Sequence, residues 1–148
     1  MHVIREAKAS DIPQVIDGIK HFVSVSSYGR DDAVNADHVT ATLNSLISSD
    51  DGLVAVLERE GVFCGCFVGM AHAHLFSGER MLGELFIYTT MEARGNGSKL
   101  RRYAEEWAKG RGCRTFTIAH PESEAHLAKV YARWGFKPCE TSYRKELF

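Results

Sequence analysis

A glycine-rich turn, Arg94-Gly95-Asn96-Gly97-Ser98, stands between a strand-like run at 82–88 and an amphipathic helix that begins near Ser98. The first backbone N–H groups of a helix have no partner inside the helix, and the helix dipole adds partial positive charge there. Glycines let the backbone approach a ligand without a Cβ in the way. The turn therefore predicts that an anion, most often a phosphate, binds at residues 93–99.

The spacing of this turn excludes two common nucleotide-binding motifs and leaves one structural alternative. A GxxxxGK[ST] phosphate loop needs Lys-Ser or Lys-Thr after its last glycine, whereas Ser98 precedes Lys99 here. A dinucleotide GxGxxG loop needs a third glycine where Leu100 stands. The alternative to a phosphate site is a turn whose glycines only supply unusual backbone angles.

Two further patterns could do chemistry on the strands before the turn. Glu84 is a charge inside an otherwise apolar strand, and a desolvated carboxylate has a raised pKa that makes it a better base. The alternative for Glu84 is a rim residue or an ion-pair partner. His72 and His74 alternate on one face of the preceding strand, where they could line a pocket, act as a base or form half of a metal site. No third ligand is evident, so no metal is predicted.

The elements that must position these residues follow from hydrophobic periodicity. Helices are predicted at about 10–23, 37–48, 98–110 and 123–134, and strands at 3–5, 53–57, 62–76, 81–88, 114–119, 137–139 and 142–147. Hairpin-linked strands over 53–88 indicate an antiparallel meander. The order predicts one α/β (α+β) domain over 1–148, with a mixed, largely antiparallel sheet of six to seven strands and about four helices on both faces. The glycine turn then lies at the carboxyl end of the fourth strand, where open α/β sheets bind ligands.

Three segments of the chain resemble the GNAT superfamily of N-acetyltransferases, which use acyl-coenzyme A. The opening Ile4-Arg5-x-Ala7-x-x-x-Asp11 is similar to the family's first strand and helix cap. Residues 92–100 are similar to its pyrophosphate loop, Q/R-x-x-G-x-G/A, and residues 131–136 to its Y-x-x-x-G-F motif. Two positions depart from the pattern: Glu92 replaces the Gln or Arg of the loop, and Glu124 replaces an Asn that often precedes the tyrosine.

The resemblance implies acetyl-CoA as the cofactor, together with a geometry for it. The fourth and fifth strands separate after a bulge, and the pantetheine arm pairs in the gap with the backbone of Phe86 and Ile87. The diphosphate takes N–H groups from residues 93–98. The implied cofactor-binding residues are Phe86, Ile87, Arg94, Gly95, Asn96, Gly97, Ser98 and Lys99.

The resemblance also implies a role for one catalytic residue, and the strand pattern supplies a second. Acyl transfer to an amine needs a base for the amine, donors for the oxyanion and a proton for the departing thiolate. Tyr131 stands at the family's acid position, although it could simply pack in a helical stripe with Leu127 and Trp134. Glu84 is the predicted base, acting through water. The predicted substrate-pocket residues are Tyr28, His72, His74 and His120.

Composition limits the partners of the chain. Its 148 residues carry a formal net charge of −1, which argues against a strongly basic nucleic-acid surface. No apolar run approaches the roughly 18 residues of a membrane span, and no secretory signal is recognised at the N-terminus. The four cysteines do not form a disulfide scaffold, so small buried thiols and a cytoplasmic location are expected.

Three functions remain open from the sequence. The first is an N-acetyltransferase that moves an acetyl group from acetyl-CoA to a primary amine of a small molecule or protein, by direct transfer in a ternary complex. The second is a non-catalytic module that binds or senses acyl-CoA. The third is an α/β protein without CoA whose glycine turn is only structural. A homodimer is expected by analogy with the family alone.

Overall fold

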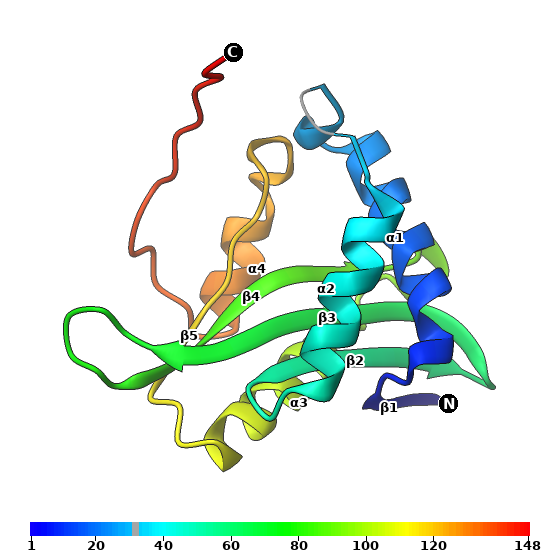
Figure 1. Ribbon diagram of the computed structural model, residues 1–148, viewed down its shortest axis with the longest axis horizontal. Helices are drawn as coiled ribbons and strands as arrows, with labels where there is room; N and C mark the ends of the chain where they lie inside the picture. Colours follow the sequence, from blue (N-terminus) through cyan, green and yellow to red (C-terminus); the bar gives the residue numbers. More distant parts are fainter. Residues whose placement is uncertain (31–32) are drawn as a thin grey trace.

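The computed structural model describes residues 1–30 and 33–148 (Figure 1). The strands in this part of the chain are β1 (His2–Glu6), β2 (Gly52–Arg59), β3 (Val62–Ala73), β4 (Arg80–Thr89) and β5 (Thr115–Thr117). The α-helices are α1 (Ile12–Val25), α2 (Ala36–Ser48), α3 (Gly97–Gly110) and α4 (Leu127–Arg133). Short 3-10 helices are η1 (Ala9–Asp11), η2 (Ser27–Arg30), η3 (Met91–Ala93) and η4 (Glu122–Glu124).

The five strands form one sheet in the order β1-β2-β3-β4-β5. The first four pair antiparallel, and β4 pairs with β5 in parallel. A tight turn joins β2 to β3, and Glu60 and Gly61 both take the positive φ that such a turn requires. The predicted meander and the mixed, largely antiparallel sheet are confirmed.

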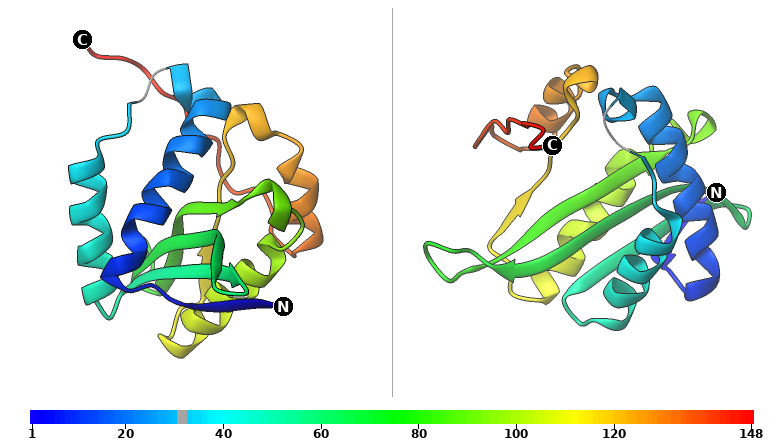
Figure 2. Two further views of the ribbon diagram at one scale, coloured as in Figure 1. Left: turned by 90° about the vertical axis from the view of Figure 1, so that its right-hand side faces the viewer. Right: turned by 45° about the horizontal axis from the view of Figure 1, so that its top comes forward.

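Helices cover both faces of the sheet, as predicted. α1 and α2 lie on one face and α3 on the other (Figure 2, left). Successive side chains of β2 alternate between two buried clusters: Ala55 and Leu57 face the cluster of α3, and Val54 and Val56 face the cluster of α1 and α2. Both faces of β2 are therefore buried, which makes it the centre of the hydrophobic core.

The prediction of two C-terminal strands, at 137–139 and 142–147, is wrong. Residues 137–148 are irregular and exposed, and the chain there runs away from the sheet (Figure 1). Within the described residues, this segment makes no hydrogen bond between backbone groups, so it does not pair with any strand of the sheet. Pro138 also lacks the N–H that a ladder uses. A period-2 pattern gives a strand its faces but does not supply the neighbouring strand on which it depends.

Other boundaries differ by a few residues. β3 ends at Ala73 rather than 76 because His74 begins the hairpin turn, accepting the Gly78 amide and donating to Glu79. β5 is limited to three residues, since its pairing with β4 stops at Thr117. In residues 1–30 and 33–148, no helix combines the length and the hydropathy of a membrane span.

Candidate active site

β4 and β5 separate part-way along the sheet. Their parallel pairing runs from Met81 with Thr115 to Gly83 with Thr117, while β4 continues to Thr89. A register shift in the β3–β4 ladder places Gly69 opposite Glu84 and Val68 opposite Phe86, so Leu85 is an extra residue. Such a bulge bends the strand that carries it. From residue 84 onward, β4 therefore has one edge without a strand partner.

The alternation of an antiparallel ladder determines which backbone groups occupy this open edge. The Thr90 amide donates to the Cys64 carbonyl at 2.9 Å, so the even-numbered residues after the bulge direct their backbone groups to β3. Ile87 and Thr89 then direct theirs to the open edge. Of the two residues predicted to pair with a ligand there, Ile87 occupies an open-edge position and Phe86 a ladder position.

The glycine turn follows the open edge directly. Gly95 has a φ of 94°, a conformation that favours glycine, and α3 begins at Gly97. Asn96 does not cap the helix, because its side-chain amide donates to the Ala93 carbonyl at 3.0 Å. Among the described residues, none accepts a hydrogen bond from the amides of Gly95, Gly97 or Ser98. Unpaired amides thus gather at a helix N-terminus, which is favourable for a diphosphate.

Side chains add positive charge around the turn. Arg94 and Lys99 are both exposed, and Ser98 is half-buried. Glu92, which replaces the Gln or Arg of the resembled motif, is exposed as well. Two cations therefore accompany the free amides, and the carboxylate of Glu92 has access to solvent.

Glu84 and Tyr131 meet at the backbone of one residue, Ala119, just beyond the end of β5. The Ala119 amide donates to Glu84 Oε1 at 2.9 Å, and the Tyr131 hydroxyl donates to the Ala119 carbonyl at 3.0 Å. Burial raises the pKa of Glu84 to about 7, although the hydrogen bond from Ala119 acts in the opposite direction. Burial, and then the charge of Glu84, raises the pKa of Tyr131. A carboxyl group with a pKa near neutrality and a protonated phenol thus lie close together where β4 and β5 separate.

The four predicted pocket residues lie in different places. The His120 ring lies 5.9 Å from that of Tyr131, so these two are brought together. His72 is exposed on β3, whereas His74 belongs to the following turn and packs against Phe76, so the two do not share a strand face. Tyr28 lies in η2, after α1. Asp31 and Asp32, which from the sequence are either solvated loop charges or carboxylates that attract a cationic amine, lie outside the described residues.

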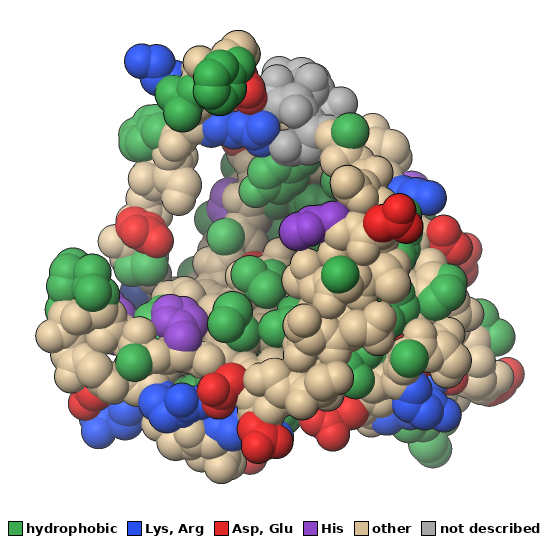
Figure 3. All heavy atoms as spheres, in the orientation of Figure 1, with side chains coloured by type: hydrophobic (Ala, Val, Ile, Leu, Met, Phe, Trp, Pro, Cys, Tyr) green, Lys and Arg blue, Asp and Glu red, His purple; other side chains and the backbone are tan. Residues whose placement is uncertain are grey.

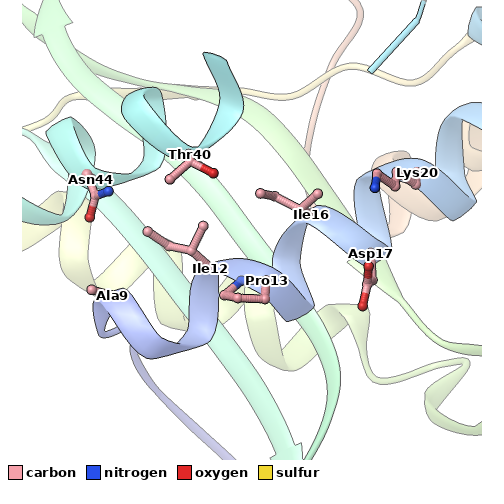
Figure 4. Close-up of a pocket in the computed structure, with 8 residues that line it drawn as sticks. All are labelled: Ala9, Ile12, Pro13, Ile16, Asp17, Lys20, Thr40 and Asn44. Atoms are coloured by element: carbon pink, nitrogen blue, oxygen red, sulfur yellow. The ribbon is translucent and has the colours of Figure 1, made fainter. Parts of the chain in front are cut away.

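A groove of about 380 Å³ between α1 and α2 is a separate feature (Figure 4). It is lined by Ala9, Ile12, Pro13, Ile16, Asp17, Lys20, Thr40 and Asn44. None of these residues belongs to the glycine turn or to the group of Glu84, Ala119 and Tyr131, here named the Ala119 cluster, so the groove is not part of the candidate site. In the described part of the chain, no three His, Cys, Asp or Glu side chains come together to hold a metal ion.

The chain matches the profile of a known protein family. Residues 23–136 match the sequence profile described as Acetyltransferase (GNAT) family. The chain belongs to the GNAT acetyltransferase family. It is therefore an acyltransferase, and acetyl-CoA is its cofactor.

Solved structures share the GNAT fold of this chain across its length. A transcriptional regulator from Bacillus halodurans is 20% identical with a TM-score of 0.81, over 99% of this chain and 100% of the other. Glucosamine-6-phosphate N-acetyltransferase from Arabidopsis thaliana is 16% identical with a TM-score of 0.77, over 100% and 99%. The aminoglycoside acetyltransferase AAC(6')-Iy, with a bisubstrate analogue, is 17% identical with a TM-score of 0.80, over 99% of each chain. No curated protein sequence matches the chain.

Sequence reasoning missed two residues of the candidate site. Ala119 contributes only backbone groups, so no side chain marks it, and β5 was expected to extend through it. Thr89 contributes its backbone to the open edge, and strand alternation from Ile87 would have indicated it. Phe86 was selected in its place because the bulge at Leu85 cannot be located from the sequence.

Proposed function

We propose that this GNAT protein transfers the acetyl group of acetyl-CoA to a primary amine of a small molecule within a ternary complex. The observation that carries the proposal is the Ala119 cluster, which holds Glu84 and Tyr131 at one end of the open β4 edge, while free amides occupy the other end. Acetyl-CoA supplies an activated acetyl thioester. The described residues fit this group, because an extended amide arm needs a free strand edge and a diphosphate needs unpaired N–H donors.

The cofactor would be held mainly by backbone groups. The amides of Gly95, Gly97 and Ser98 would bind the diphosphate, with Arg94 and Lys99 adding charge. The backbone at the open-edge positions, 87 and 89, would bind the arm. Because these contacts are made by the main chain, they tolerate the unusual Glu92 at the start of the loop.

Glu84 would act as the general base. A free alkylamine is almost fully protonated at neutral pH, since its pKa lies near 10.4. A carboxylate with a pKa of about 7 accepts a proton far better than an ordinary glutamate, directly or through one water. The Ala119 amide keeps this carboxylate oriented toward the end of β5.

Tyr131 would act as the general acid. Its phenol is protonated at neutral pH and can give that proton to the departing sulfur, although burial raises its pKa and makes it a weaker acid than an exposed tyrosine. In the structure the hydroxyl hydrogen is directed to the Ala119 carbonyl, which orients the phenol before a cofactor is present.

A thiol-release assay tests the proposed function against its two alternatives. With DTNB as the thiol reagent, acetyl-CoA and a panel of primary amines should give free CoA in an amine-dependent and enzyme-dependent manner. Acetyl-CoA binding by calorimetry without thiol release from any amine would favour the non-catalytic module. Absence of both binding and release would favour a purely structural glycine turn.

Gly97→Val should weaken acetyl-CoA binding, with Kd increased by at least about tenfold, because β-branched atoms would occupy the approach to the free amides. The fold should persist, since a Cβ at this position meets only the Trp134 ring, at 3.5 Å, and φ is not positive. Gly110→Val, in the same helix with nothing within 4 Å of a Cβ, is the matched control. Wild-type affinity of Gly97→Val in calorimetry would contradict the loop assignment.

The neighbours named N-acetyltransferases support a small-molecule amine as the acceptor class. A protein acceptor, a homodimer, a cytoplasmic location and a single domain over 1–148 stay predictions. The acceptor itself depends on the side chains next to the Ala119 cluster.

A further inference from the structure

A row of aromatic rings leads from η2 to β4, beside the candidate site. The Tyr28 ring lies 5.9 Å from that of Phe22, and the Phe22 ring lies 5.2 Å from that of Phe86 in an edge-to-face arrangement. Phe86 in turn stacks with Tyr88 at 5.9 Å and 11°. The row thus connects the end of α1 to the open-edge strand, two residues beyond Glu84.

The segment that carries Tyr28 is held against the other side of the site. The Ser27 amide donates to Ser123 Oγ at 2.8 Å, across 96 positions of the sequence. Ser123 belongs to η4, which follows His120, and the His120 ring contacts Tyr131. The aromatic row and the Ala119 cluster therefore border the same region. The surface is hollowed between the C-terminal segment and the body of the molecule, with hydrophobic side chains on its floor (Figure 3).

Packing of the hydrophobic core explains only two of the four rings in the row and leaves Phe22 and Tyr28 unexplained. Phe86 and Tyr88 pack against the core cluster of α1 and α2, but Phe22 and Tyr28 belong to neither core cluster. Tyr28 is 42% exposed, and Leu85, at the bulge, is 55% exposed. Apolar side chains at this position offer a surface to a ligand, and none of the four rings carries a charge.

We propose that this row selects the acceptor, and that the acceptor is a primary amine with an aromatic ring a short alkyl chain from its nitrogen. The inference rests on the proposed function. The ring of such an amine would stack on Phe22 and Tyr28, on the face of the sheet that α1 and α2 cover. Glu84 pairs with Gly69 and belongs to the other face, so the short alkyl chain would carry the nitrogen to Glu84 through the gap between β4 and β5. The rings themselves carry no carboxylate for the further cationic groups of a polyamine.

The transfer step balances for such an acceptor. The amine nitrogen forms a bond to the acetyl carbon as the carbon–sulfur bond breaks. The nitrogen, which arrives as the ammonium ion, first loses one proton to Glu84, and that proton passes to solvent. Once the bond to the acetyl carbon has formed, the nitrogen loses a second proton to Glu84. The departing sulfur gains one proton from Tyr131, and the proton held on Glu84 then returns to the Tyr131 phenolate through water. The products are an N-acetylated arylalkylamine and free CoA.

Acceptor preference in the thiol-release assay tests the inference. Wild-type kcat/KM should be at least about tenfold higher for 2-phenylethylamine than for n-butylamine, and higher than for kanamycin or glucosamine 6-phosphate. Phe22→Ala and Tyr28→Ala should each reduce the preference for the aryl amine to about threefold or less, mainly through KM. Phe76→Ala, a phenylalanine that is 89% exposed in the hairpin between β3 and β4, is the control and should keep the preference.

The outcomes separate the inference from the function on which it rests. A higher kcat/KM for kanamycin or glucosamine 6-phosphate would overturn the aromatic acceptor while leaving an N-acetyltransferase in place. An unchanged preference in both ring variants, with acetyl-CoA affinity showing that they are folded, would also overturn it. If none of the amines supports thiol release, the proposed function is overturned, and the aromatic acceptor with it.

Discussion

Tyr131→Phe should lower kcat by about 10² to 10⁴-fold while the affinity for acetyl-CoA stays within about twofold of wild type. The substitution keeps the ring, which is buried and lies 5.6 Å from that of Trp134 and 6.0 Å from that of Phe136. It removes only the hydroxyl, and with it the hydrogen bond to Ala119 and the proton for the sulfur. Thiol release under saturating acetyl-CoA measures kcat, and calorimetry measures the affinity.

Tyr103→Phe provides a matched control for the loss of a phenol. Tyr103 is partly buried in α3 against the core cluster there, apart from Glu84 and Ala119. Its variant should keep wild-type turnover. If Tyr131→Phe also turns over at the wild-type rate, Tyr131 is a packing residue in the α4 stripe and the acid must be sought elsewhere.

Glu84→Gln should lower kcat/KM by about 10² to 10⁴-fold and remove its dependence on pH near neutrality. In the wild type, kcat/KM should rise with pH and level off above about 7, because only the ionised carboxylate accepts a proton. Measurements of kcat/KM with acetyl-CoA between pH 5.5 and 8.5 follow this rise. Glu79→Gln, on an exposed side chain of the hairpin, is the control. If kcat/KM of Glu84→Gln rises with pH as it does in the wild type, a group other than Glu84 causes the rise.

The same substitution should stabilise the protein at alkaline pH. The pKa of Glu84 is about 7 in the folded chain against an ordinary value of 4.5, so the folded state binds the proton more tightly. Stability from this group is present below pH 4.5 and is lost as the pH rises through 7. Glutamine has no charge to desolvate. The difference in Tm between Glu84→Gln and the wild type should therefore move in favour of the variant from pH 4.5 to pH 8, and a difference independent of pH would contradict the burial of a titrating carboxyl.

Local patterns in the sequence determined much of this protein. The Gly95 and Gly97 turn between a strand and a helix, the meander over 53–88 and the placement of Tyr131 on a helix all depend on neighbours a few residues away. Side-chain chemistry also marked Glu84, since a charge in an apolar strand stands out. These features need no knowledge of distant parts of the chain.

Tertiary structure alone decided how those parts meet. Ala119 joins Glu84 to Tyr131 through its backbone, which no side chain announces. The bulge at Leu85 places the backbone groups of Ile87 and Thr89, rather than those of Phe86, at the open edge. The two predicted C-terminal strands do not form because no strand pairs with them. Each depends on register and pairing between segments distant in sequence, because backbone hydrogen bonds are alike for every residue and only the fold determines which of them remain free.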